Sequence, residues 1–191
     1  MLTIAALALH AASAEPTTPA PEREILGAFK AACSRTGSDI EAMKADAQAS
    51  GWTAMPEEAN PRVARLVKLG RDAADSDGKV AGANFHRTLG GREVFLIVSR
   101  YEDRTGFWGS GCRLYDFEAP APLDGAALEA LMGKPPTGVE TPAPGLSKRL
   151  WEPGWRDGIT VEINHVPKDH PVGQQYGLSG NILVAQAIGG F

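Results

Sequence analysis

The sequence predicts an α+β domain in which one antiparallel sheet of about five or six strands carries helices mainly on one face. Helical spacing of apolar residues dominates the first part of the chain, whereas alternating apolar residues separated by turn signals dominate the rest. Helices come before and between hairpin-linked strands without regular strand-helix alternation, which favours an antiparallel sheet. The length of 191 residues suits one domain.

The start of the chain predicts export. Residues 1–14 carry no charged side chain, and their apolar run ends in Ala12-Ser13-Ala14, which has the small-x-small pattern of a signal cleavage site. Residues 15–21, rich in Pro, Thr and Ala, predict an extended linker, so residues 22–191 form the expected folded domain. We therefore expect a periplasmic or secreted protein.

Three helices are expected before the sheet. The first carries Phe29 and Cys33 on one stripe and ends at Gly37, and the second opens with the capping-box pattern of residues 38–41. The third begins at Asn60-Pro61, an N-cap followed by proline at the first helical position. A fourth helix is expected over residues 123–132, inside the strand region.

Strands are expected on both sides of the fourth helix. Gly90-Gly91 suits the positive φ angles of a tight hairpin turn. The expected strands are 84–89, 93–101 and 107–117, followed by strands near 146–151, 158–166 and 178–188. Residues 134–147, which contain four prolines, predict a long loop without regular structure.

Cys33 and Cys112 are the only cysteines. In an oxidising compartment two such thiols most simply form a structural disulfide, although a metal-ligand pair or a reactive thiol remain alternatives. Cys112 shares a strand face with Trp108 and Leu114, so a bridge requires the first helix to pack on that face. The two Cα atoms must then lie within about 7 Å of each other.

Composition and hydropathy argue against two classes of protein, although a local basic patch stays open. The chain has 19 basic and 23 acidic residues, a formal net charge of -4, which argues against a general nucleic-acid binder. Beyond the leader no window approaches the ~20 apolar residues of a membrane span, so none is expected in the mature chain. No sequence motif calls for a cofactor.

Trp151 and Trp155 flank a Trp-Glu-Pro-Gly-Trp turn and are candidates for a ligand-binding platform, since aromatic faces stack on flat ligands. Core packing is the competing interpretation. If the platform exists, this turn and the loop of residues 134–147 would form the contact surface.

His165, Asp169 and His170 are candidate metal ligands. Two imidazoles and a carboxylate within six residues suit zinc or a similar cation, with His86 as a further member if its strand lies nearby. The spacing matches no established zinc signature, and His165 alternates with Ile163 on one strand face, which favours a structural role. Gly109-Ser110-Gly111 lacks the glycine spacing of a nucleophile elbow, and Ser110 falls on the face of Cys112, where we expect it to be buried.

The leader, Phe29-x-x-x-Cys33 on the first helix, Gly51-Trp52 after the second and Cys112 on a later strand together resemble small uncharacterised secreted proteins of bacteria. The resemblance covers roughly residues 22–132. It implies export and a helix-to-strand disulfide, and it implies no activity.

The leading hypothesis is an exported, non-catalytic domain of the cell envelope that binds a small ligand or a partner protein. A metal-assisted enzyme that uses His165, Asp169 and His170 is the alternative, and whether the protein is an enzyme stays open. A purely structural envelope protein is the third hypothesis.

Overall fold

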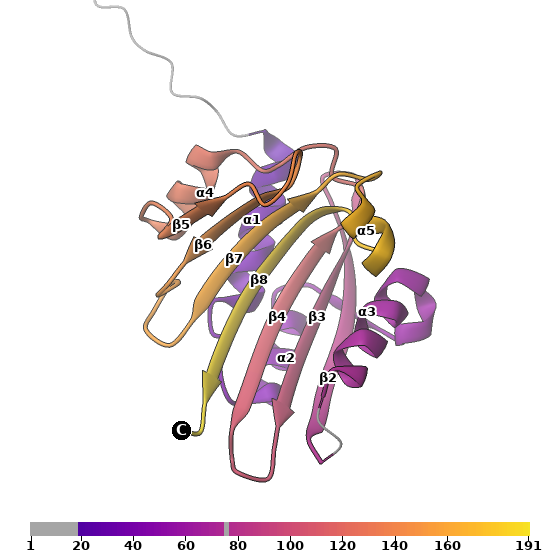
Figure 1. Cartoon of the computed structure of the whole chain (residues 1–191), viewed down its shortest axis with the longest axis vertical. Helices are drawn as coiled ribbons and strands as arrows, with labels where there is room; N and C mark the ends of the chain where they lie inside the picture. The colour runs from indigo at the N-terminus through magenta and orange to yellow at the C-terminus, as the bar shows by residue number, and fades with distance from the viewer. Residues whose placement is uncertain (1–18, 75–76) are drawn as a thin grey trace, which may run out of the picture.

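A computed structural model describes residues 19–74 and 77–191. Across these residues the chain forms one eight-stranded antiparallel sheet in the order β1-β2-β3-β4-β8-β7-β6-β5 (Figure 1). The predicted α+β class and antiparallel sheet are confirmed, but the prediction of five or six strands is wrong. The unpredicted strands, β1 (Thr53–Met55) and β5 (Gly138–Glu140), are three residues long, too short to show an alternating pattern, and form the two sheet edges.

Most of the predicted elements lie close to their expected positions, although β2 begins five residues before the predicted strand 84–89. The remaining strands are β2 (Lys79–Leu89), β3 (Arg92–Glu102), β4 (Trp108–Asp116), β6 (Ser147–Trp151), β7 (Thr160–Val166) and β8 (Gly180–Gly189). The helices are α1 (Ala20–Cys33), α2 (Ile40–Ala49), α3 (Pro61–Asp72), α4 (Gly125–Met132) and α5 (Pro171–Tyr176), with a 3-10 turn η1 (Glu57–Ala59). No element was expected where α5 lies. The predicted signal of residues 1–14 lies outside the described residues.

Several boundaries differ from the sequence-based expectation. Helix α1 begins at Ala20, so its first turn overlaps the end of the expected linker. Asp39, rather than Ser38, caps α2, because its carboxylate accepts hydrogen bonds from the backbone of Glu41 and Ala42. Strand β5 lies within the segment that was expected to lack regular structure, where it pairs with β6.

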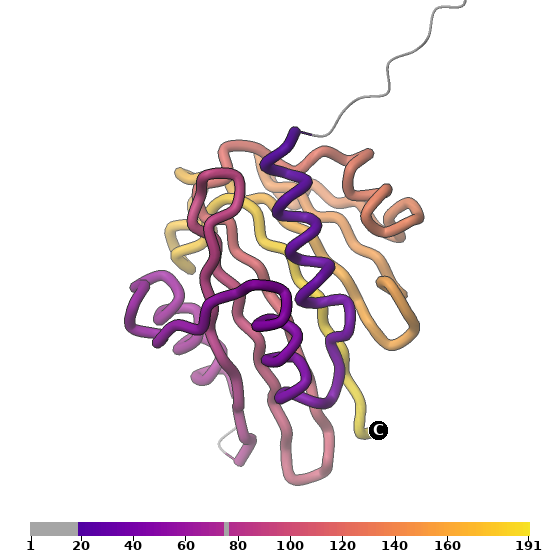
Figure 2. The backbone as a smooth tube through the Cα atoms, turned by 180° about the vertical axis from the view of Figure 1, so that it is seen from behind, coloured from indigo at the N-terminus to yellow at the C-terminus, as the bar shows by residue number. Residues whose placement is uncertain are grey.

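The sheet has two different faces. Helices α1, α2 and α4 cover one of them, which we call the helix face, and Figure 2 shows α1 and α2 lying across it. Apolar side chains of β3, β4, β7 and β8 meet these helices there and form the main core. Helices α3 and α5 lie on the other side, which we call the open face (Figure 1). On that face a smaller apolar cluster joins Val63 of α3 to Phe95, Tyr115 and Ile182.

The disulfide joins the helix face to α1. Cys33 and Cys112 are bonded, with their Cα atoms 5.5 Å apart, and both residues are fully buried. The predicted bridge and the predicted packing of α1 on that face of β4 are therefore confirmed. Among the described residues, no helix has the length and apolar character needed to cross a bilayer.

Candidate ligand-binding site

The tryptophans predicted to bind a ligand lie on the helix face. Trp151 has no exposed surface, and its indole Nε1 donates to the Lys134 carbonyl at 3.1 Å. Trp155 is half-buried, with its ring 5.3 Å from that of Phe29. A ligand site at this turn stays a prediction, and the burial of Trp151 does not favour it.

The predicted metal ligands do not assemble into a site. Residues 19–74 and 77–191 contain no group of three or more His, Cys, Asp or Glu side chains that could hold a metal ion. His165 is buried, and its Nδ1 lies 3.0 Å from the Asn181 amide oxygen. His170 instead caps α5 by accepting from the Val172 amide, and Asp169 is exposed. His86 contacts Glu93 on neighbouring strand β3. Metal-assisted catalysis therefore stays a prediction.

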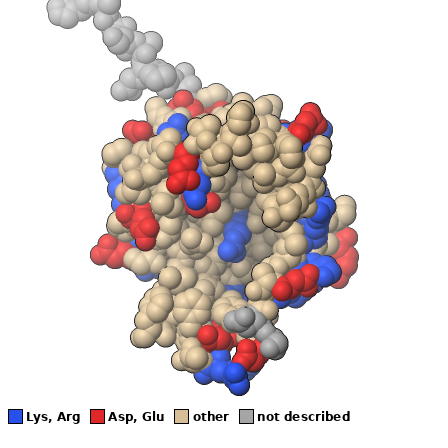
Figure 3. All heavy atoms as spheres, in the orientation of Figure 1, with Lys and Arg blue, Asp and Glu red and all other residues tan. Residues whose placement is uncertain are grey.

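The open face contains a hollow that no sequence motif had indicated. Its volume is about 500 Å³, which lies in the range of small-molecule pockets. Strands β2, β3, β4 and β8 supply its floor, while Leu66, Val67 and Gly70 of α3 line it from one side. Figure 3 shows this face hollowed near its centre, with basic side-chain atoms inside the depression.

The floor of the hollow contains three glycines, which have no side chains. Gly82 on β2 and Gly109 and Gly111 on β4 all line it. A Cβ atom built on Gly109 would find its nearest neighbour, the Ile188 Cγ2 atom, at an ordinary 3.7 Å. A Cβ atom on Gly111 would instead lie 2.1 Å from an Nη atom of Arg113, because the guanidinium lies over that glycine. The missing side chain thus leaves open space at Gly109, whereas at Gly111 the Arg113 guanidinium occupies that space.

Strand register places the residues of the floor in rows that run across the sheet. Neighbouring rows lie about 7 Å apart, because side chains on one face recur every second residue. Arg113 lies between Ile97 and Val184 in one row. The next row holds Gly82, Ser99, Gly111 and Gln186, and the row beyond it holds Val80, Tyr101, Gly109 and Ile188. From the Gly111 row to the Gly109 row, the residues of the floor therefore change from polar to mostly apolar.

Arg113 is the distinctive charge of the site. Its Nη1 donates to the Ser99 hydroxyl oxygen at 3.0 Å, and no described carboxylate lies within ion-pair distance of it. A guanidinium has five N–H donors, so most of its donors are available to a ligand. Half-buried cations of this kind are usually paired, because desolvation is costly.

The other charged groups that line the hollow are already compensated. Arg71 binds both carboxylate oxygens of Glu57, at 2.6 and 2.7 Å, and these hydrogen bonds hold the pKa of Glu57 below its ordinary value. Arg100 points to the helix face, where it pairs with Glu102 at 2.9 Å and lies over the Trp108 ring. Arg113 alone, among the described charges lining the hollow, has no ionic partner.

Tyr115 lies one row from Arg113 on the same face of β4 and also lines the hollow. Burial raises the pKa of its phenol above the ordinary value of 10.0, although the nearby charge of Arg113 opposes that shift. Tyr115 is therefore a neutral phenol near pH 7. Its ring stacks on Phe117, with centroids 5.5 Å apart.

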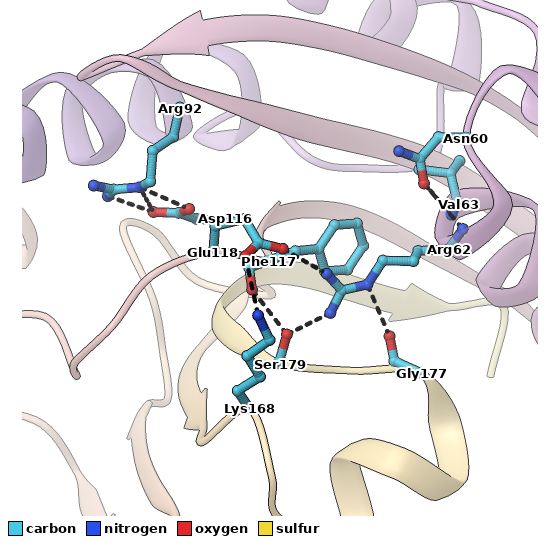
Figure 4. A network of polar contacts seen from close by, with 10 residues as sticks. All are labelled: Asn60, Arg62, Val63, Arg92, Asp116, Phe117, Glu118, Lys168, Gly177 and Ser179. Carbon is cyan, nitrogen blue, oxygen red and sulfur yellow. Dashed lines mark hydrogen bonds and ion pairs between the residues drawn. The ribbon is translucent and has the colours of Figure 1, made fainter.

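A polar network fixes α3 beside the hollow (Figure 4). The Arg62 guanidinium donates to Glu118 at 3.0 Å, to the Gly177 carbonyl at 3.3 Å and to Ser179, and it lies 4.1 Å from the centre of the Phe117 ring. These contacts tie the first turn of α3 to the segment after β4 and to the turn before β8. The side wall of the hollow is thus attached to its floor.

A second ion pair in Figure 4 holds the end of β4. Arg92 binds the fully buried carboxylate of Asp116 through hydrogen bonds of 2.7 to 3.1 Å, and these bonds raise the pKa of Arg92. Strands β3 and β4 are therefore linked at the end of the sheet away from Gly109.

No protein-family model, curated protein or solved structure matches this chain significantly. The chemistry of the site is therefore inferred from its own residues. Sequence reasoning missed Arg113, although a signal was present: a charged residue in a central strand, preceded at two and four positions by glycine. Ser110, between those glycines, is buried on the helix face as expected.

Proposed function

We propose that this chain is a non-catalytic binding domain that holds a small organic ligand in the hollow of the open face. The observation that supports it best is the glycine floor. A sheet face that is only solvated or packed has no need of three glycines on β2 and β4, since glycine weakens a strand. Here they lie in the floor of a hollow of about 500 Å³, beside Leu66, Val67 and Gly70 of α3.

The composition of the lining supports binding rather than catalysis. Pockets for small molecules combine an apolar lining with a few polar groups that orient the ligand. Leu66, Val67 and Ile97 provide apolar surface, while Arg113 and Ser99 provide polar groups. Among the described lining residues there is no histidine or cysteine, and Glu57 is engaged by Arg71. A nucleophile with an adjacent base is thus not assembled there.

The disulfide supports export as part of this proposal. Structural disulfides persist in oxidising compartments and are rare in the cytosol. The Cys33–Cys112 bond connects a helix to a central strand inside the core, which is typical of a structural bond. We accordingly place the domain in the periplasm or outside the cell, with no cofactor.

A neutral fluorescent probe tests the proposed function. Nile red, which gains fluorescence in apolar pockets, should bind the wild-type protein, and Gly109→Val should weaken that binding at least about tenfold by filling the floor. Gly138→Val is the matched control, because a Cβ atom there also has its nearest neighbour at 3.7 Å and Gly138 does not line the hollow. Equal binding by both variants, with both folded by circular dichroism, would contradict the proposal.

A further inference from the structure

We propose, building on the proposed function, that the hollow selects an amphipathic monocarboxylate: its carboxylate binds the Arg113 guanidinium, and its slender apolar chain lies along the glycine floor toward Val80 and Ile188. An acyl chain with a free carboxylate end is the simplest molecule of this class. The proposal depends on the charge balance of the hollow and on the direction in which the hollow becomes apolar.

The charge balance calls for one negative charge. Arg113 is the uncompensated cation among the described charges of the hollow, whereas Glu57 is bound by Arg71. Glu162 on β7 lies in the same row of the sheet as Arg113, beyond Val184. Its carboxylate is 3.2 Å from the Lys148 ammonium, so it does not neutralise Arg113 either. A ligand with a single carboxylate completes the balance, and a planar guanidinium binds a carboxylate through two parallel hydrogen bonds.

The position of the guanidinium suits such a head group. It lies over Gly111, a residue with no side chain to cover it, and Ser99 holds one of its nitrogens. The donors not used by Ser99 are available to a carboxylate above the floor. Because Ser99 and Arg113 come from adjacent strands β3 and β4, the sheet, and not a loop, fixes the position of the head-group site.

The hollow becomes apolar away from Arg113. The Arg113 guanidinium lies over Gly111, and Gly109 follows two positions farther along β4, about 7 Å away at ~3.4 Å per residue. At the Gly109 row, Val80 is 41% exposed and Ile188 is 59% exposed, which is unusual for large apolar side chains on one sheet face. A chain that extends from the head group toward this apolar surface passes over Gly109, where no side chain fills the floor.

Four probes, each used below its micelle concentration and measured by titration calorimetry, test the proposal. Decanoate should bind at least about tenfold more tightly than decanol, which lacks the charge, because charge-assisted hydrogen bonds are stronger than neutral ones. Acetate, which lacks the chain, should bind more weakly still. Decyl phosphate tests a different head group. If it binds more tightly than decanoate, the assignment of a carboxylate is wrong.

Two variants connect the selectivity to Arg113. Arg113→Gln should lower the affinity for decanoate at least about tenfold and leave that for decanol unchanged, which a purely structural role would not produce. Gly111→Ala should have the same effect, because the new methyl group displaces the guanidinium. Lys168→Gln is the matched control: it removes the same charge from an 81% exposed side chain that does not line the hollow.

The outcomes separate this inference from the proposed function. If Nile red binds and Gly109→Val excludes it, but decanoate binds no better than decanol, the ligand class is wrong and the hollow remains a binding site. If decanoate selectivity survives both Arg113→Gln and Gly111→Ala, Arg113 is not the head-group site. If neither Nile red nor decanoate binds the wild-type protein, the proposed function itself fails.

Discussion

Replacing both cysteines with alanine removes the covalent link between α1 and the central strand β4. The bond closes a loop over a sequence separation of 79 residues. On the chain-entropy model, opening a loop of that size increases the entropy of the unfolded chain by the equivalent of about 4.5 kcal/mol at 25 °C. Since domains of this size have a free energy of unfolding of about 5–15 kcal/mol, the Cys33→Ala/Cys112→Ala variant should lose a large part of its stability.

Urea unfolding followed by tryptophan fluorescence measures this loss. The free energy of unfolding in water should fall by about 4–5 kcal/mol in the double variant. Reduced wild-type protein should show the same loss, and a reducing agent should not change the double variant further. A loss below about 1 kcal/mol would refute the loop-closure reasoning. If both thiols react with a labelling reagent in unreduced, exported protein, the bond itself is absent.

Three further predictions concern the support of the site. Arg92→Met leaves the buried Asp116 carboxylate without its partner and should lower the free energy of unfolding by about 3–5 kcal/mol. Adding Asp116→Leu should restore most of the lost stability. A double variant no more stable than Arg92→Met would contradict the role of the ion pair. The pKa of Tyr115 in the folded state lies above the unfolded value of 10.0, so the contribution of its neutral phenol to the free energy of unfolding is fully present below pH 10 and is lost as the pH rises toward the folded-state pKa. Tyr115→Phe should reduce this loss in urea melts at alkaline pH. An unchanged pH profile would argue against this role of Tyr115. Arg62→Met should destabilise the protein by about 1.5–3 kcal/mol, and amide hydrogen exchange should become faster mainly in α3. Equally faster exchange in all elements would show that Arg62 does not hold α3 beside the hollow.

The parts of the fold that sequence predicted are those with strong local signals. Helix α1 has a complete apolar stripe, Asn60-Pro61 marks the start of α3, and Gly90 and Gly91 take φ angles of 55° and 77° in the β2–β3 hairpin. Short elements have no such signal. Strand β1 is too short to show a period, and its place at the edge comes from pairing with residues 84–86 of β2.

The site was harder to predict because it depends on register. Arg113, Ser99 and Gly82 lie on three strands, and only the pairing of those strands brings them into one hollow. The sequence did show that Cys112 and Ser110 face away from Arg113, so the face of β4 was predictable. The predicted clusters at Trp151 and His165 rested on closeness in sequence, and hydrogen bonds to Lys134 and Asn181 occupy those side chains instead.

The most direct test of the binding site is an NMR titration with decanoate that follows the backbone amides and the tryptophan indole N–H signals. We expect the largest shifts at Ser99, Gly109 and Gly111, on the floor of the open face. Largest shifts at the indoles of Trp151 and Trp155, with the glycine amides unmoved, would contradict it.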